Sequence, residues 1–178
     1  MVLIPIPIVQ AALEAGYRHI DGAWIYNNEA AVGSALQAMA HHVPRESVFI
    51  TSKLWNTFHN PEDIEPTLDE TLRMLQTEYL DLYLIHWPIA QTPTGGGTNV
   101  VDWDLTERPI KTWLKLEELV RAGKIRNIGV SKSVFFSFHF SSNFTDLYAF
   151  RSASTSAGFK TSQHLHLSPS NPQSTKSN

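Results

Sequence analysis

The chain has 178 residues, of which 42% are hydrophobic and 17% charged, and its net charge at pH 7 is −3. This length suits one domain with a sizeable core. The absence of cysteine excludes disulfides, thiolate catalysis and cysteine zinc sites. No apolar run reaches the roughly 18 residues that span a membrane, and no basic patch with interleaved aromatic residues indicates nucleic-acid binding. We expect a cytoplasmic protein without membrane, nucleic-acid or metal partners; the sequence makes no prediction of the oligomeric state.

Predicted helices and strands alternate along most of the chain. Helical periodicity and capping residues mark the helices, and short β-branched or apolar runs mark the strands. The predicted helices cover residues 8–15, 29–41, 61–75 and 109–121. The predicted strands cover residues 17–20, 48–51, 80–85 and 125–130. This alternation predicts βα units with a parallel sheet.

Two segments depart from the alternation. We predict a long polar loop over residues 91–104, which contains Gly95–Gly97. A loop of that length often forms one side of a substrate pocket. Residues 132–178 contain a single acidic residue and end in SPSNPQSTKSN. Within them, residues 134–140 (VFFSFHF) are apolar enough for a strand, and from about Ser141 we expect mostly disorder. We therefore predict a domain over residues 1–131 and a serine-rich tail over residues 132–178.

The first three predicted strands are each followed by a polar, ionisable side chain. Asp21 follows the first strand, with Tyr26 five residues further on, and Lys53 and His86 follow the next two. The separations are 32 residues from Asp21 to Lys53 and 33 from Lys53 to His86, close to the roughly 30 residues of a βαβ unit. Chemistry in α/β proteins is placed at the carboxyl ends of the strands. We therefore expect these four side chains on one rim of the sheet.

Each of these residues also has an ordinary structural explanation. Asp21 could be a solvated turn acid, Lys53 a surface lysine, His86 a core histidine and Tyr26 a packing residue. Their shared position and regular spacing favour a common site instead. The chemistry is coherent, because a tyrosine is a weak acid with a pKa of about 10 and a neighbouring ammonium favours its phenolate. A carboxylate can hold that ammonium, and a neutral imidazole can orient a carbonyl oxygen. Together they predict a general-acid site for reducing a C=O bond.

Four segments in order resemble the signature segments of the aldo-keto reductases, with features of the fungal members. They are GYRHIDGAWIYNNEAAVG, FITSKLW, YLDLYLIHWP and KIRNIGVS, and the resemblance covers roughly residues 11–131. It implies an α/β fold, a partial (β/α)₈ TIM barrel with about four parallel strands. It also implies NADPH-dependent reduction of aldehydes and ketones, with NADPH bound without a Rossmann glycine motif and a small carbonyl compound as substrate.

The resemblance also implies residue roles. Tyr26 would donate the proton, Lys53 and Asp21 would tune it, and His86 would orient the substrate. The implied cofactor contacts are Asp21 and Ser131. The implied substrate-pocket residues are Trp24, Trp55, His86 and Trp87.

The chain departs from the family pattern in three places. The family's glycine-rich first strand would precede the first helix, where this sequence has MVLIPIPIV. The family's Ser-Asn-Phe after the fourth strand is replaced by Ser131-Lys132-Ser133. Nothing resembling the last three strands follows, and in the family those strands carry the lysine and arginine that hold the adenosine 2′-phosphate.

Three hypotheses follow. The chain is a carbonyl reductase by descent, with the acid–base half of the site and little or no turnover by itself. Alternatively, it is a non-catalytic nucleotide-binding or regulatory module on the same fold. In the third hypothesis it is a non-functional truncated product whose tail is translated non-coding sequence.

Overall fold

The structure is a computed structural model that describes residues 6–95, 97–132 and 164–166. The predicted strand at 134–140, and all but three residues of the predicted disordered segment, lie outside the described residues. The helices are α1 (Ile6–Glu14), α2 (Glu29–Met39), α3 (Pro61–Leu75), α4 (Trp103–Glu107) and α5 (Ile110–Arg121), with 3-10 turns η1 (Trp24–Tyr26), η2 (Arg45–Ser47) and η3 (Asn56–Phe58). The strands are β1 (His19–Asp21), β2 (Phe49–Leu54), β3 (Leu82–Ile85), β4 (Gln91–Pro93), β5 (Asn99–Val101), β6 (Ile128–Val130) and β7 (His164–His166).

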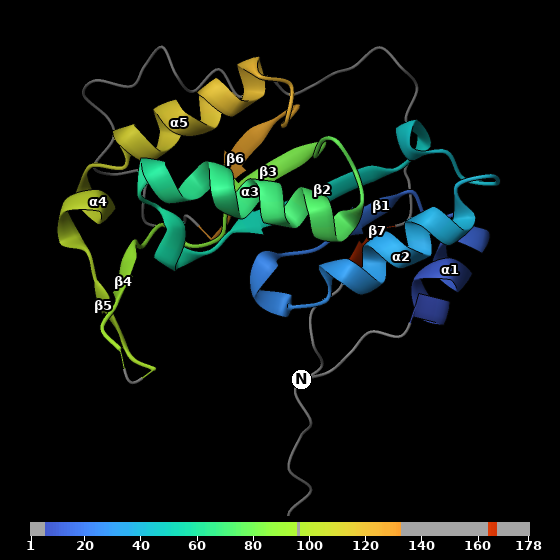
Figure 1. The fold of residues 1–178 in the computed structure, drawn as a ribbon, viewed down its shortest axis with the longest axis horizontal. Coiled ribbons are helices and arrows are strands. Elements are labelled where there is room, and N and C mark those ends of the chain that lie inside the picture. Colours follow the sequence, from blue (N-terminus) through green and yellow to red (C-terminus); the bar gives the residue numbers. More distant parts are fainter. Residues whose placement is uncertain (1–5, 96, 133–163, 167–178) are drawn as a thin grey trace, which may run out of the picture.

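The main sheet is parallel throughout, in the order β6-β3-β2-β1-β7. Helices α1, α2, α3 and α5 form a layer along one side of this sheet (Figure 1), and consecutive members of that layer contact each other. Successive parallel strands with a helix between them are the repeating unit of a (β/α)₈ barrel. The predicted parallel α/β architecture is therefore confirmed.

The core lies between the sheet and the helix layer because strand side chains alternate between the two faces. Ile20, Ile50 and Tyr83 are at most 1% exposed, and they belong to a single hydrophobic cluster with the apolar stripes of α1, α2, α3 and α5. In the strands, the residues between these core positions belong to the opposite face. The same alternation that builds the core therefore places Asp21 and Lys53 on the face away from the helices.

Residues 91–104 do not form the long polar loop that the sequence predicts. They form an antiparallel hairpin of β4 and β5, followed by the start of α4. Gly95 and Gly97 have φ of +76° and +82°, the left-handed conformation that glycine adopts without strain. Asp102 caps α4, its carboxylate accepting from the Leu105 N–H at 3.0 Å. The prediction was wrong because it overlooked a hairpin signal in this segment, namely β-branched residues on both sides of a glycine turn.

The outer edge of β1 is paired with β7, in the register His19 with His164 and Asp21 with His166. The sequence marks residues 134–140 as apolar enough for a strand, but they lie outside the described residues, and the tail segment that pairs with β1 is residues 164–166. A segment of three residues, two of them histidines, carries little strand signal, so only its pairing with β1 reveals it.

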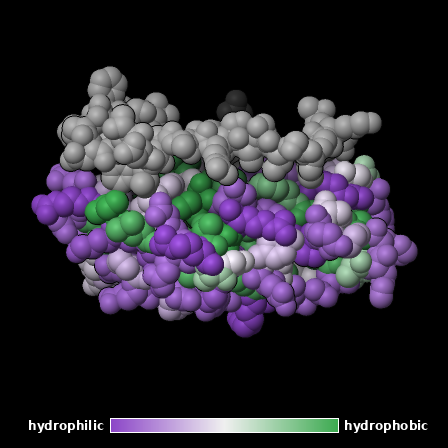
Figure 2. Space-filling model, turned by 90° about the horizontal axis from the view of Figure 1, so that it is seen from above, coloured by the Kyte–Doolittle hydropathy of each residue, from purple (hydrophilic) through white to green (hydrophobic). Residues whose placement is uncertain are grey.

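Hydrophilic residues make up most of the described surface seen from above, with hydrophobic residues in separate patches (Figure 2). Among the helices within the described ranges, none has the length and apolar character needed to traverse a bilayer.

Candidate active site

An ion pair between neighbouring strands forms the centre of the candidate site. The register pairs Asp21 with Thr51, and Lys53, two residues further along β2, shares the face of Thr51. The Lys53 ammonium donates to Asp21 Oδ1 at 2.6 Å and to the Gly22 carbonyl at 2.7 Å. Lys53 is 5% exposed, so this pairing offsets the cost of burying its charge. The predicted contact between ammonium and carboxylate is present.

The sequence predicts Lys53 just after the end of a strand. In the structure, Lys53 lies inside β2. The strand continues to Leu54, and its residues from Ile50 to Leu54 are all buried. The extra length carries the ammonium under the turn that follows β1.

That turn brings Tyr26 back over Lys53. The Gly22 N–H extends the ladder by donating to the Thr51 carbonyl at 2.9 Å, and the chain then winds through η1. The turn ends at Asn27 with φ of +52°, a left-handed conformation that asparagine tolerates better than most residues. As a result, the Lys53 ammonium lies 5.5 Å from the centre of the Tyr26 ring.

His86 follows β3 directly and faces Tyr26. The backbone N–H of His86 donates to the Leu54 carbonyl at 3.1 Å. The His86 and Tyr26 rings meet edge to face, with centres 5.9 Å apart and planes at 86°. Burial, with smaller contributions from the positive charges of Lys132 and Lys53, lowers the pKa of His86 to about 4. The imidazole is therefore neutral at neutral pH. Its Nδ1 atom is buried, with no hydrogen-bond partner in the part of the chain that is described.

Two of the three predicted pocket tryptophans lie beside His86. Trp55 meets its ring edge-on at 5.3 Å, and Trp87 lies nearly parallel to it at 6.4 Å and 22°. Trp87 is 39% exposed. These rings give the imidazole an apolar surrounding with one side open to solvent.

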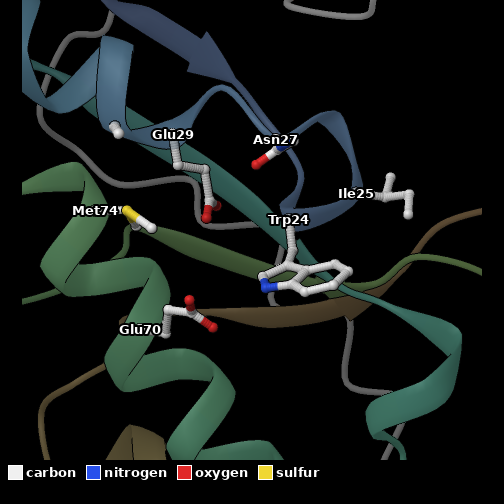
Figure 3. Close-up of a pocket in the computed structure, with 7 residues that line it drawn as sticks. Trp24, Ile25, Asn27, Glu29, Glu70 and Met74 are labelled. Carbon is white, nitrogen blue, oxygen red and sulfur yellow. The ribbon is translucent and has the colours of Figure 1, made fainter. Parts of the chain in front are cut away.

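Trp24 is placed elsewhere. Its ring packs edge-on against Phe58 at 4.8 Å and lines a cavity of about 420 Å³ between η1, α2 and α3. Figure 3 shows the indole facing the Glu70 side of this cavity, with Ile25 pointing away from it. Spacing alone could not tell which side of the turn Trp24 would occupy.

Ser131 follows β6 at the same edge of the sheet, and its N–H donates to the Ile85 carbonyl at 2.8 Å. Its neighbour Lys132 was not among the predicted site residues. Lys132 adopts φ of +58°, and its ammonium lies 3.9 Å from the centre of the Trp87 ring. Asp21, Lys53 and His86 were selected because each is an ionisable residue just after a predicted strand. Lys132 follows the fourth predicted strand in the same way, so the same criterion would have found it.

The structure thus combines a parallel barrel-type sheet with an acid–base group at its carboxyl edge. The chain belongs to the aldo/keto reductase family, whose model matches residues 5–136.

Known proteins support this assignment. Aldo-keto reductase family 1 member A1 of Sus scrofa is 49% identical over 131 residues, covering 69% of this chain and 40% of that protein. The D/L-glyceraldehyde reductase of Hypocrea jecorina is 44% identical over 129 residues, covering 67% of this chain and 39% of that protein. This chain thus spans about two fifths of the length of the curated relatives it matches.

A solved structure supports the fold. The aldo-keto reductase of Bombyx mori in complex with NADP has a TM-score of 0.60 at 40% identity, covering 70% of this chain and 39% of that one. The predicted partial TIM barrel is therefore confirmed.

Proposed function

We propose that residues 1–131 form a partial reductase domain whose site reduces a small aldehyde or ketone with NADPH. The observation that carries this proposal is the position of Lys53, held by Asp21 at 2.6 Å and lying 5.5 Å from the Tyr26 ring, next to a neutral His86. Separate structural roles would not require a lysine to be buried beneath a phenol. This arrangement suits a tyrosine that gives up its proton.

In the proposed mechanism, each side chain has one task. Tyr26 donates the proton to the carbonyl oxygen of the substrate. Lys53 stabilises the phenolate that remains, since a cation close to a developing anion is favourable in a partly buried site. Asp21 keeps the ammonium in place through its 2.6 Å contact. His86, neutral because burial lowers its pKa to about 4, can donate one N–H to the same carbonyl oxygen and so orient it.

Carbonyl reduction also needs a hydride, which a bound nicotinamide cofactor supplies. Asp21 and Ser131 lie at the same edge of the sheet and fit the nicotinamide end of NADPH as hydrogen-bonding groups. The contacts to the 2′-phosphate that the family resemblance implies have no counterpart in this chain. Two charge-assisted contacts at about 1.5–3 kcal/mol each correspond to roughly two to four orders of magnitude in affinity. We therefore propose that the 178-residue chain by itself binds NADPH weakly and turns over little.

The substrate proposal rests on the fungal relative, which is named a D/L-glyceraldehyde reductase. We propose glyceraldehyde or a similarly small carbonyl compound for this chain. The partly buried ring of Trp55 and the exposed ring of Trp87, both beside His86, suit a substrate with some apolar surface.

The test is NADPH oxidation with glyceraldehyde, measured for the chain itself and for a chimera. In the chimera, residues 11–131 replace the matching segment of the Sus scrofa relative, so that the site is present at full family length. We expect low turnover from the chain and clear turnover from the chimera. Tyr26→Phe should lower kcat of the chimera by about 10²–10⁴-fold, the usual contribution of a general acid.

Tyr17→Phe is the matched control, because Tyr17 also loses one hydroxyl but precedes β1. It should leave kcat unchanged. Chimera turnover that survives Tyr26→Phe would exclude Tyr26 as the proton donor. Strong turnover by the 178-residue chain alone would show that its weak NADPH binding was wrongly proposed.

The non-catalytic alternative has one observation in its favour, the limited share of the relatives' length that the chain matches. It predicts that the 178-residue chain binds NADP⁺ or a nucleotide fragment measurably and shows no Tyr26-dependent turnover, whereas the proposed function predicts weak cofactor binding with low, Tyr26-dependent turnover. The same assay series therefore separates the two functions.

A further inference from the structure

Lys132 places a second ammonium at the candidate site. It follows Ser131 at the end of β6, and its left-handed backbone with φ of +58° turns the side chain back toward Trp87. The ammonium lies 3.9 Å from the centre of the Trp87 ring, and that ring lies 6.4 Å from the His86 ring. A cation over a tryptophan face is held there by the ring quadrupole.

This second ammonium leaves the site with an excess of positive charge. The charge of Lys53 is neutralised by Asp21 at 2.6 Å, whereas no ion pair of Lys132 is found among the residues that the structure describes. His86 contributes no charge at neutral pH, since burial lowers its pKa to about 4. The three ionised groups therefore sum to one positive charge at the mouth of a partly buried site.

We propose that Lys132 is a substrate-recognition residue that binds a carboxylate on the far end of the carbonyl substrate. The proposal rests on the proposed function, because it takes His86 and Tyr26 as the position of the reacting carbonyl. The Lys132 ammonium lies 3.9 Å from the centre of the Trp87 ring, and that centre lies 6.4 Å from the centre of the His86 ring. The ammonium is therefore at most roughly 10 Å from the His86 ring, a separation that suits a small aromatic or straight-chain aldehyde acid. The exposed part of the Trp87 ring would pack against the body of that substrate.

An ammonium prefers a carboxylate over a neutral ester because the hydrogen bond it donates is charge-assisted. Such a bond is lost when the carboxylate is esterified, although the shape of the aldehyde barely changes. The comparison of an acid with its methyl ester therefore isolates the charge of the ligand.

The first measurement is binding without cofactor, so that it does not depend on turnover. Calorimetry or NMR titration gives the Kd of 4-carboxybenzaldehyde and of methyl 4-formylbenzoate for the 178-residue chain. We expect the acid to bind at least about ten-fold more tightly than the ester, the effect of one modest charge-assisted contact. Lys132→Met should abolish this preference and Lys132→Arg should retain it.

Lys111→Met is the matched control, because Lys111 is an exposed lysine on α5 and its removal changes the net charge equally. It should leave the preference intact. A second arm measures NADPH binding, since the cofactor's phosphates are the other source of negative charge. Lys132→Met should not weaken NADPH binding.

A third readout reports on the geometry itself. NMR titration of the His86 ring should show its pKa rising in Lys132→Met, because a positive charge that disfavours protonation has been removed. A lysine that lies away from His86 in solution would leave this pKa in place.

The proposal is overturned if the unmodified chain shows no preference for the acid over the ester, including the case in which neither aldehyde binds. It is also overturned if the preference survives Lys132→Met, or if Lys132→Met weakens NADPH binding and leaves the preference unchanged. If the preference depends on Lys132 while the chimera shows no Tyr26-dependent turnover, the recognition role stands and the proposed reduction fails. The two ideas therefore fail separately.

Discussion

At the scale of single residues, buried histidines set how stability responds to acid. His59 is 4% exposed, and burial lowers its pKa to about 4. In the unfolded chain a histidine has a pKa of about 6.5. Between these values the unfolded state binds more protons, so the free energy of unfolding falls as the pH falls from 6.5 toward 4. His86 acts in the same direction, as its pKa is also lowered.

Burial raises the pKa of Glu29, despite hydrogen bonds from Ser52 and Thr71 to its carboxylate. The folded state then holds this proton more tightly than the unfolded state does. The stability that Glu29 contributes is therefore present at low pH and declines as the pH rises above the ordinary range of a glutamate. Its effect is common to all variants at other positions and cancels when they are compared.

From the size of its pKa shift, His59 should lower the free energy of unfolding by up to about 3 kcal/mol between pH 6.5 and pH 4. We predict that His59→Gln abolishes this part of the pH dependence. Urea unfolding at several pH values measures this slope. His41→Gln, at an exposed position, is the control and should keep the slope of the unmodified chain. An unchanged slope in His59→Gln would show that His59 is not buried in its neutral form.

At the scale of elements, the contact between α2 and α3 depends on Gly33. A Cβ atom on Gly33 would meet the Met74 carbonyl oxygen and would lie 2.7 Å from the Leu75 carbonyl carbon. Both atoms belong to the backbone of α3, so no side-chain rotation can relieve the contact. Helix propensity alone favours alanine over glycine by about 1 kcal/mol, and the two effects oppose each other.

We expect the clash to win, so that Gly33→Ala destabilises the chain by about 1–3 kcal/mol, the usual cost of overpacking. Ser34→Ala on the same helix is the control, since Ser34 is partly exposed and its hydroxyl bonds only within the helix. It should change stability by at most about 0.5 kcal/mol. Equal or greater stability in Gly33→Ala would mean that α2 and α3 do not approach this closely.

At the scale of the whole molecule, the edges of the parallel sheet decide solution behaviour. Within the described residues, β6 ends the sheet on one side and β7 covers β1 on the other. A strand of three residues is a short cover, and unpaired strand edges promote self-association. We therefore expect the purified chain to self-associate or to unfold over a broad temperature range.

Leu165→Pro should increase self-association, because proline removes a backbone N–H from the strand paired with β1. Leu165→Ala keeps that N–H and should behave like the unmodified chain. Size-exclusion chromatography and thermal unfolding monitor both variants. A sharp two-state transition that Leu165→Pro leaves unchanged would contradict the role of β7 as an edge cover.

The sequence alone determined the repeating architecture and the central ion pair. The alternation of strand and helix patterns predicts parallel βα units, and the regular spacing of Asp21, Lys53 and His86 brings them to one edge. These features depend on local pattern and chain length, which a sequence records directly. Lys53 therefore meets Asp21 as predicted, even though β2 ends one residue later than its lysine.

Only the tertiary structure decided where the side chains outside this repeat point. Trp24 lines a separate cavity, Lys132 lies over Trp87, and β7 pairs with β1. The same holds for Gly33, which reads as an ordinary helix interior until α3 is packed against it. Each of these depends on a left-handed turn residue or on a partner distant in sequence. Periodicity carries no information about either, because both arise from the path of the chain in space.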